Sequence, residues 1–309
     1  MSYKTDETTD RYSKRRDEIQ EMMSKTSNRK IYVNKLVTIL TICCVIFAII
    51  PLGSILFEVF KNGYSAIDLE FLTQKPGSIV SNKGGIGPAI QGTLIVVGLG
   101  SLIAVPVGVL AGIYLSEYAK SNSKFAFLVR FFSDVLTGLP SIIVGIVGYV
   151  LIVLSIGSFS VIAGAFSLSL IMIPLVTRIT EESLKIVPNS IREGAHSLGI
   201  PKWKITLFIV IKTASSGILT GIVLSIARIA GETAPLIMTI LGTSLFFSSF
   251  TGPVDALPLR IWRLASQPYE SAHANGWGAA LILILIILSL NITLRLISQR
   301  KGMGSSRNI

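Results

Sequence analysis

The stretch Val187-Pro-Asn-Ser-Ile-Arg-Glu-Gly-Ala-His-Ser-Leu-Gly-Ile-Pro-Lys-Trp203 is a short polar interruption between two hydrophobic segments. Within it, Ser190 followed by Glu193 matches a capping box, which predicts the start of a helix. Gly199 favours the left-handed conformation that ends a helix, and Pro201 cannot continue one. The stretch is therefore predicted to form a helix of about two turns, too short to cross a membrane.

The predicted helix has an apolar face formed by Ile191, Ala195 and Leu198 at helical spacing. Because an isolated helix of this length is marginal in water, we expect it to dock on another surface. That surface is either the ends of the neighbouring spans or a groove of another protein. A helix that lies on the membrane surface is an equal alternative on spacing alone.

The composition is that of a protein that crosses a membrane several times. Half of the 309 residues are hydrophobic and only 15% are charged. Apolar runs of about 20 residues predict an all-α protein with six transmembrane helices. The spans are predicted near residues 36–58, 88–116, 126–153, 159–178, 207–238 and 277–297. Cys43 and Cys44 are adjacent, and His196 and His273 lie in separate connections, so no metal site is expected.

The net charge of +11 raises the question whether the partner is nucleic acid. With the N-terminus inside, 22 of the 28 Lys and Arg residues fall in tails and connections expected on the cytoplasmic side, and five fall outside. This asymmetry is the positive-inside pattern of a membrane protein. We therefore expect both termini and the helix around Glu193 in the cytoplasm, and no nucleic-acid partner.

The charge pattern also divides the chain. Residues 1–34 are rich in both signs of charge and poor in apolar residues, so they cannot bury a core and are predicted to form a cytoplasmic tail. Residues 35–300 hold the predicted spans, and residues 301–309 form a short C-terminal tail in the cytoplasm.

Small residues at one-turn spacing occur twice in the predicted spans. Gly108 and Gly112 form one pair, and Gly217 and Gly221 form the other. Such pairs let a second helix approach closely, so both spans are predicted to pack against neighbouring helices.

The fifth predicted span contains Arg228-Ile-Ala-Gly-Glu232. A charged side chain at membrane depth costs about 3 kcal/mol or more, so both charged residues should face protein or a water-filled cavity. Their spacing of four predicts that they share one helix face. They either form an ion pair that only fixes helix packing or line a polar pathway, in which Arg228 offers several donors to an oxyanion. We favour the pathway, because ionisable groups inside a membrane are more often functional.

A second polar interruption lies in the third predicted span. Asp134, Thr137 and Ser141 are close together there, beside Pro140. These side chains could also face the pathway, although Asp134 could be no more than a residue at a helix end.

The chain carries no motif for chemistry of its own. It has no G-x-x-x-x-G-K-[ST] phosphate-binding loop and no large polar segment to hold a nucleotide-binding domain. It also has no Ser/His/Asp or Cys/His set. An enzyme is not expected, and if ATP drives the protein, a separate subunit hydrolyses it.

The polar helix resembles the cytoplasmic EAA motif of type I ABC importer membrane subunits, through Glu193-Gly-Ala195, Gly199 and the later Ile209. The resemblance implies that family's transmembrane permease fold, with a coupling helix near residues 190–199. It also implies that this helix docks into a cleft of an ATPase subunit, which uses ATP and Mg²⁺. The coupling residues implied are Glu193, Gly194, Ala195, Leu198 and Gly199.

Three further stretches resemble the permeases of phosphate-specific ABC importers, and the resemblance covers residues 87–296. They are Asp134–Gly145, Ala227–Leu236 and Leu257–Pro268. The form Gly231-Glu-Thr-Ala-Pro235 is similar to PstA-type rather than PstC-type subunits. The resemblance implies inorganic phosphate as substrate, a PstC-type permease as heterodimer partner, ATPase subunits and an external phosphate-binding protein. The phosphate pathway residues implied are Asp134, Thr137, Ser141, Arg228, Glu232 and Thr233.

Other functions remain open at this point. A permease for another oxyanion, such as phosphonate, sulfate or molybdate, would have the same architecture. An ion-coupled secondary transporter could use Arg228 and Glu232 as a charge relay, although the polar docking helix argues against it. A membrane-embedded enzyme would need a catalytic constellation that the sequence lacks.

Overall fold

The computed structural model describes residues 4–77, 84–120 and 122–303. The chain divides into two units, residues 1–58 and residues 59–309. Helix α1 (Lys4–Gly63) makes up the described part of the first unit as far as Glu58. Its last five residues, from Val59, belong to the second unit. From residue 4 onward the charged tail is therefore helical, and α1 continues into the predicted first span, which is apolar enough over Lys30–Ala66 to cross a membrane.

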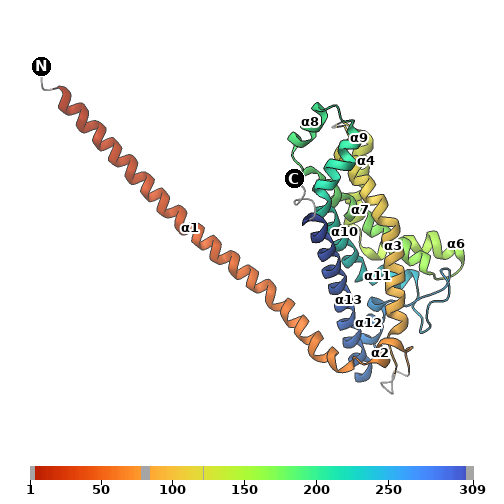
Figure 1. The fold of residues 1–309 in the computed structure, drawn as a ribbon. Coiled ribbons are helices and arrows are strands. Elements are labelled where there is room, and N and C mark those ends of the chain that lie inside the picture. The colour runs from red at the N-terminus through yellow and green to blue at the C-terminus, as the bar shows by residue number, and fades with distance from the viewer. Residues whose placement is uncertain (1–3, 78–83, 121, 304–309) are drawn as a thin grey trace. The chain divides into compact units, whose positions relative to one another are not determined.

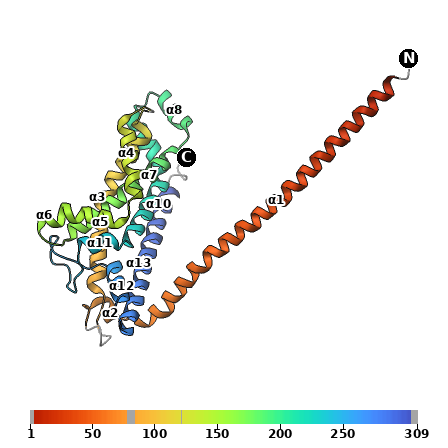
Figure 2. The same cartoon turned by 180° about the vertical axis from the view of Figure 1, so that it is seen from behind.

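The second unit is a bundle of helices. Its elements are η1 (Tyr64–Ala66), α2 (Leu69–Thr73), α3 (Gly87–Ile113), η3 (Tyr114–Tyr118), α4 (Lys124–Gly138), α5 (Ser141–Gly148), η4 (Tyr149–Val153), α6 (Leu154–Ile156), α7 (Val161–Lys185), α8 (Asn189–Ser197), α9 (Lys202–Lys204), η5 (Ile205–Val210), α10 (Ile211–Ala230), α11 (Ala234–Thr239), α12 (Leu257–Ala265) and α13 (Glu270–Met303). Short helix α8 lies at one end of this bundle, and α2 and α12 lie at the other (Figures 1 and 2).

Polar side chains cap the N-termini of several of these helices. Ser123 accepts a hydrogen bond from the Ala126 amide at the start of α4. Ser160 accepts one from the Ala163 amide at the start of α7, just after the chain has turned at Gly157 with a φ of 77°. This turn lies in the break expected between the third and fourth spans. A serine at the N-cap satisfies an amide that has no partner within the helix.

Helix α7 is the centre of the second unit. It packs against α3, α4, α5, α10 and α11, and it has the largest buried share of the candidate spans in this unit. The predicted glycine pairs explain its closest contacts. A Cβ at Gly112 of α3 would lie 2.6 Å from the Cβ of Thr180, and a Cβ at Gly217 of α10 would lie 3.0 Å from the Ser183 hydroxyl oxygen. Both pairs therefore let neighbouring helices approach α7, as predicted.

The third predicted span is not a single straight helix. It consists of α4 and a second segment, Ser141–Ile156, which are bent by 106° at a break of two residues. Leu139 is extended, with a φ of −72° and a ψ of 138°, because the residue before a proline is disfavoured in the helical region. The prediction of one span over 126–153 is corrected to a bent pair.

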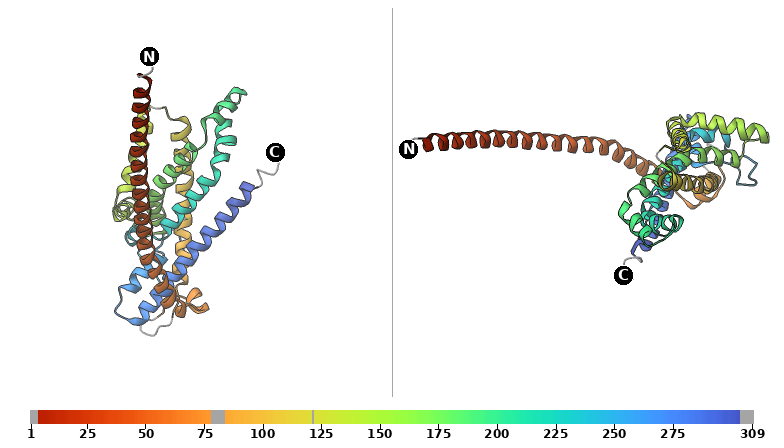
Figure 3. Two further views of the ribbon diagram at one scale, coloured as in Figure 1. Left: turned by 90° about the vertical axis from the view of Figure 1, so that its left-hand side faces the viewer. Right: turned by 90° about the horizontal axis from the view of Figure 1, so that it is seen from above.

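The fifth predicted span is also shorter than expected. Helix α10 ends at Ala230, and the chain leaves helical bonding over residues 231–233 before α11 begins. Pro235 in the first turn of α11 has no amide hydrogen to continue a helix from α10. The last span, α13, packs against α10 and α12 (Figure 3). The described residues thus contain five long apolar helices, and the bent pair makes a sixth candidate span.

Candidate functional site

A small hollow between α4, α5, α7 and α10 contains four of the polar residues singled out in the sequence. Thr137, Ser141, Arg228 and Glu232 line it, and its volume is about 70 Å³. Its apolar wall consists of Leu136, Leu139, Ile171 and Leu175. Residues 137 and 228 are far apart in the sequence, so the fold brings together two polar interruptions that the sequence shows separately.

Breaks in the helices position these four side chains. Thr137 is in the last turn of α4, Ser141 is the first residue of α5, and Arg228 is in the last turn of α10. Glu232 lies beyond the end of α10, between Gly231 and Thr233. The prediction that Arg228 and Glu232 share one helix face is therefore wrong, because the helix stops between them. They meet because both line the same hollow.

Arg228 is available for an anion in this arrangement. Its side chain is exposed and Glu232 is half-buried, and neither takes part in an ion pair among the residues that the structure describes. A guanidinium offers several N–H donors in a planar fork that suits an oxyanion. The hydroxyl of Thr137 donates to the Ser133 carbonyl oxygen at 2.7 Å. Because a hydroxyl has a single hydrogen, Thr137 can only accept any further hydrogen bond.

Two of the predicted pathway residues lie outside this hollow. Asp134 lines a different recess, where its carboxylate is 3.7 Å from the Arg178 guanidinium. Arg178 also pairs with Glu182 at 3.2 Å on the same helix. Thr233 precedes α11 and makes no side-chain cap there. The structure therefore groups Asp134 with the charged end of α7 rather than with Arg228.

Helix α8 forms where the sequence predicts a short polar helix, but it starts differently. The helix begins at Asn189 after the extended Pro188, and its start has no side-chain cap. Ser190 is inside the helix, so the predicted capping box with Glu193 is wrong. The predicted end is confirmed, because Gly199 follows the helix in the left-handed region with a φ of 75°.

Only part of the predicted apolar face of α8 is buried. Ala195 is 7% exposed and belongs to a cluster of apolar residues with Leu184, Val187 and Ile205. Leu198 is 80% exposed, and Ile191, Glu193 and Gly194 are exposed as well. Helix α8 thus rests on the ends of its own spans through Ala195, whereas Ile191, Glu193, Gly194 and Leu198 face outward.

An ion pair that the sequence did not indicate holds α8 in place. The guanidinium of Arg192 binds the carboxylate of Glu117 in η3 through two nitrogens, at 2.7 and 3.3 Å. Arg192 also donates to the carbonyl oxygens of Leu184, in the last turn of α7, and of Val187, just after α7. The side chain of Glu117 is only 6% exposed. Because 75 residues separate the two partners, no local pattern in the sequence could have revealed the pair.

Helix α4 is tied to α7 near the same end of the bundle. Glu181 accepts hydrogen bonds from Arg130 of α4 at 2.8 Å and from Lys185 at 2.6 Å. Arg130 also donates to the Leu115 carbonyl oxygen of η3. Among the described residues, no group of three or more His, Cys, Asp or Glu side chains could hold a metal ion.

Comparison with known proteins matches this chain to one protein family. Residues 104–302 match the model of the binding-protein-dependent transport system inner membrane component. A phosphate transport system permease protein PstA from Haemophilus influenzae is 41% identical over 87% of this chain and 94% of its own length. The probable PstA of Methanocaldococcus jannaschii is 36% identical over 81% of this chain and 88% of its own.

Solved structures have the same fold. A chain of a bacterial alginate ABC transporter, in complex with an alginate pentasaccharide-bound periplasmic protein, has a TM-score of 0.63 and 16% identity, covering 88% of this chain and 96% of that chain. A chain of the inward-facing MetNI methionine ABC transporter has a TM-score of 0.56 and 16% identity, covering 70% of this chain and 94% of that chain. These likenesses bear on the fold alone.

Proposed function

This chain belongs to the binding-protein-dependent transport system inner membrane components, and we propose that within this family it is the PstA-type permease subunit of an ATP-driven inorganic phosphate importer. It is a multi-pass membrane protein and a transport subunit. Its likeness to PstA permeases over most of both chains supports phosphate as the substrate, in preference to another oxyanion or an ion-coupled carrier.

The observation that best supports a translocation role is the hollow around Arg228. A phosphate ion that crosses a layer of low dielectric constant needs a compensating positive group. Arg228 supplies that group where the helices break, with Thr137 and Ser141 as neutral polar neighbours. A site that bound too tightly would trap the ion. The Glu232 carboxylate in the same hollow lowers the net charge there and favours release.

The partners proposed for this subunit follow from the same family. A PstC-type permease would complete the pathway, and an external phosphate-binding protein would deliver the ion. Separate subunits would bind ATP and Mg²⁺ and dock on α8, through Glu193, Gly194, Leu198 and the turn at Gly199. The exposure of these residues supports a docking role. In this proposal both termini and α8 are cytoplasmic.

Uptake of labelled phosphate tests the proposal directly. Vesicles that contain this chain, its partner permease, the ATPase and the binding protein should take up phosphate only with ATP, and excess sulfate or molybdate should not compete. Arg228→Gln should abolish uptake while the complex still assembles, with the exposed Arg178→Gln as a matched control that retains uptake. ATP-dependent uptake of sulfate or molybdate instead would refute the substrate, and full uptake by Arg228→Gln would refute the role of that residue.

A further inference from the structure

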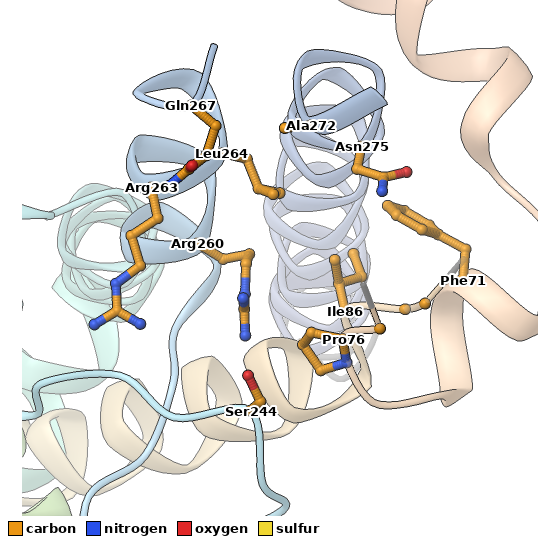
Figure 4. Close-up of a pocket in the computed structure, with 13 residues that line it drawn as sticks. Phe71, Pro76, Ile86, Ser244, Arg260, Arg263, Leu264, Gln267, Ala272 and Asn275 are labelled. Carbon is orange, nitrogen blue, oxygen red and sulfur yellow. The ribbon is translucent and has the colours of Figure 1, made fainter. Parts of the chain in front are cut away.

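A cavity lies at the end of the bundle opposite α8, away from the hollow around Arg228. Its volume is about 370 Å³, and it lies between α2, α12, the start of α13 and the segments next to them (Figure 4). The polar side chains that line it are those of Ser244, Arg260, Arg263, Gln267 and Asn275. We call this space the α12 cavity.

The α12 cavity has the charge of an anion site. Its described lining residues include two arginines, Arg260 and Arg263, and no Asp or Glu. Asp255 lies behind the wall and forms an ion pair with Arg260 at 2.6 Å. Burial raises the pKa of the Asp255 carboxyl, and the Arg260 guanidinium opposes that rise. With Asp255 ionised, one of the two positive charges remains uncompensated.

Arg260 is held so that one of its donors lacks a partner. The residue is 9% exposed, and one terminal nitrogen contacts Asp255 and the Thr243 carbonyl oxygen. Its Nε makes no hydrogen bond among the described residues. The side chain extends from α12 toward Ser244 in the cavity (Figure 4). The buried Nε does not open into the cavity, so an anion that enters would be stabilised by the charge of the guanidinium and by its terminal N–H groups.

We propose that the α12 cavity is a second oxyanion site, in which a free tetrahedral inorganic oxyanion binds before it reaches the hollow around Arg228. The identification of that ion as phosphate rests on the proposed function. Arg260 and Arg263 supply charge, and Ser244, Gln267 and Asn275 supply neutral donors. Partial neutralisation by Asp255 keeps the binding weak, as passage through successive sites requires.

Equilibrium binding of radiolabelled phosphate to the assembled importer in nanodiscs, without binding protein or ATP, tests this site. The wild type should bind phosphate at two sites for each copy of this chain. Arg263→Gln removes the charge together with the contact to the Leu241 carbonyl oxygen, and it should weaken one site at least tenfold. Arg228→Gln should weaken only the other site. Asn275→Leu provides a second variant of the cavity, since it alters neither that contact nor the Arg260–Asp255 pair.

The outcomes separate this inference from the proposed function. If wild-type vesicles import phosphate but Arg263→Gln and Asn275→Leu bind it as the wild type does, the second site is refuted and the function stands. If the two variants weaken the affinity for the binding protein but not for free phosphate, the cavity receives a carboxylate of that protein and the inference is again wrong. If the wild type imports no phosphate, the proposed function fails, whatever the cavity binds.

Discussion

The two ends of the bundle each hold a buried ion pair, and the pairs differ in how completely the arginine is bonded. Arg192 binds Glu117 through two nitrogens and also donates to two main-chain carbonyl oxygens. Arg260 binds Asp255 through one nitrogen and leaves its Nε without a partner among the described residues. The first arginine joins three segments of the fold, whereas the second keeps bonding capacity for a ligand. The comparison teaches that burial of a charge does not by itself distinguish a structural tie from a binding site.

Breaking the first pair should have the largest effect. Arg192→Met leaves the buried Glu117 carboxylate without its partner and should lower the free energy of unfolding by about 3–5 kcal/mol. The midpoint of thermal unfolding, followed by tryptophan fluorescence in detergent, measures the change. The double variant Arg192→Met, Glu117→Leu should remain less stable than the wild type, because the carbonyl oxygens of Leu184 and Val187 still lose a donor. Wild-type stability in the double variant would contradict the role of these carbonyl contacts.

The packing of α3 on α7 should show the next largest effect, since α3 leads into the segment that carries Glu117. Gly112→Ala forces a methyl group against Thr180 and should destabilise the protein by about 1–3 kcal/mol. Gly98→Ala is the matched control on the same helix, because a Cβ there meets no other atom within 4 Å. Equal unfolding midpoints for the two variants would show that close approach at Gly112 does not matter.

The turn after α8 should show a smaller effect. Gly199 has a φ of 75°, and an alanine there costs about 1–2 kcal/mol. The change should lower ATP-driven uptake more than the basal ATPase rate, because it alters the surface offered to the ATPase. Gly98→Ala is again the control, because the added Cβ meets nothing within 4 Å and lies outside α8. If Gly98→Ala lowers coupled uptake as much as Gly199→Ala does, the left-handed turn is not the cause.

The second ion pair should show the smallest effect on stability when both partners are replaced. A double variant, Asp255→Leu with Arg260→Met, removes both charges and should stay within about 1 kcal/mol of the wild type, as replacement of a buried pair by apolar residues is often neutral. The same unfolding assay measures it. Phosphate binding in the α12 cavity should be lost in this variant even though the fold is kept. Instability as large as that of Arg192→Met would mean that the second pair is also a structural tie.

Sequence reasoning predicted the features that depend on local pattern. The apolar runs predicted the spans, the glycine pairs predicted close contacts with neighbouring helices, and Gly199 predicted the end of α8. Charged and polar residues within apolar runs pointed to Arg228, Glu232, Thr137 and Ser141, which line one hollow. These signals lie within a few residues along the chain, so one sequence is enough to read them.

The features that the sequence did not reveal depend on contacts across long separations. The pairing of Glu117 with Arg192 has no local signature, and Asp134 turns to Arg178 because α4 lies beside α7. The sequence places Pro140 in the third predicted span but did not reveal a bend of 106° there. The capping box failed for a local reason, because α8 already begins at Asn189 and Ser190 lies inside it. Packing between helices decided the other cases.

One consequence concerns the wide turn η3, in which the Ala119 amide bonds to the Tyr114 carbonyl oxygen, five residues back. Such a turn holds one residue more than an α-helical turn and therefore shifts the register of all that follows. If one residue of this turn before Glu117 were deleted, the direction of Glu117 would rotate by about 100° about the helix axis. Its carboxylate would then miss Arg192 although neither side chain had changed. The ion pair that fixes α8 therefore depends on the number of residues in η3 as well as on their identity. Deletion of one codon there should break this contact, whereas a conservative substitution in η3 should leave it intact.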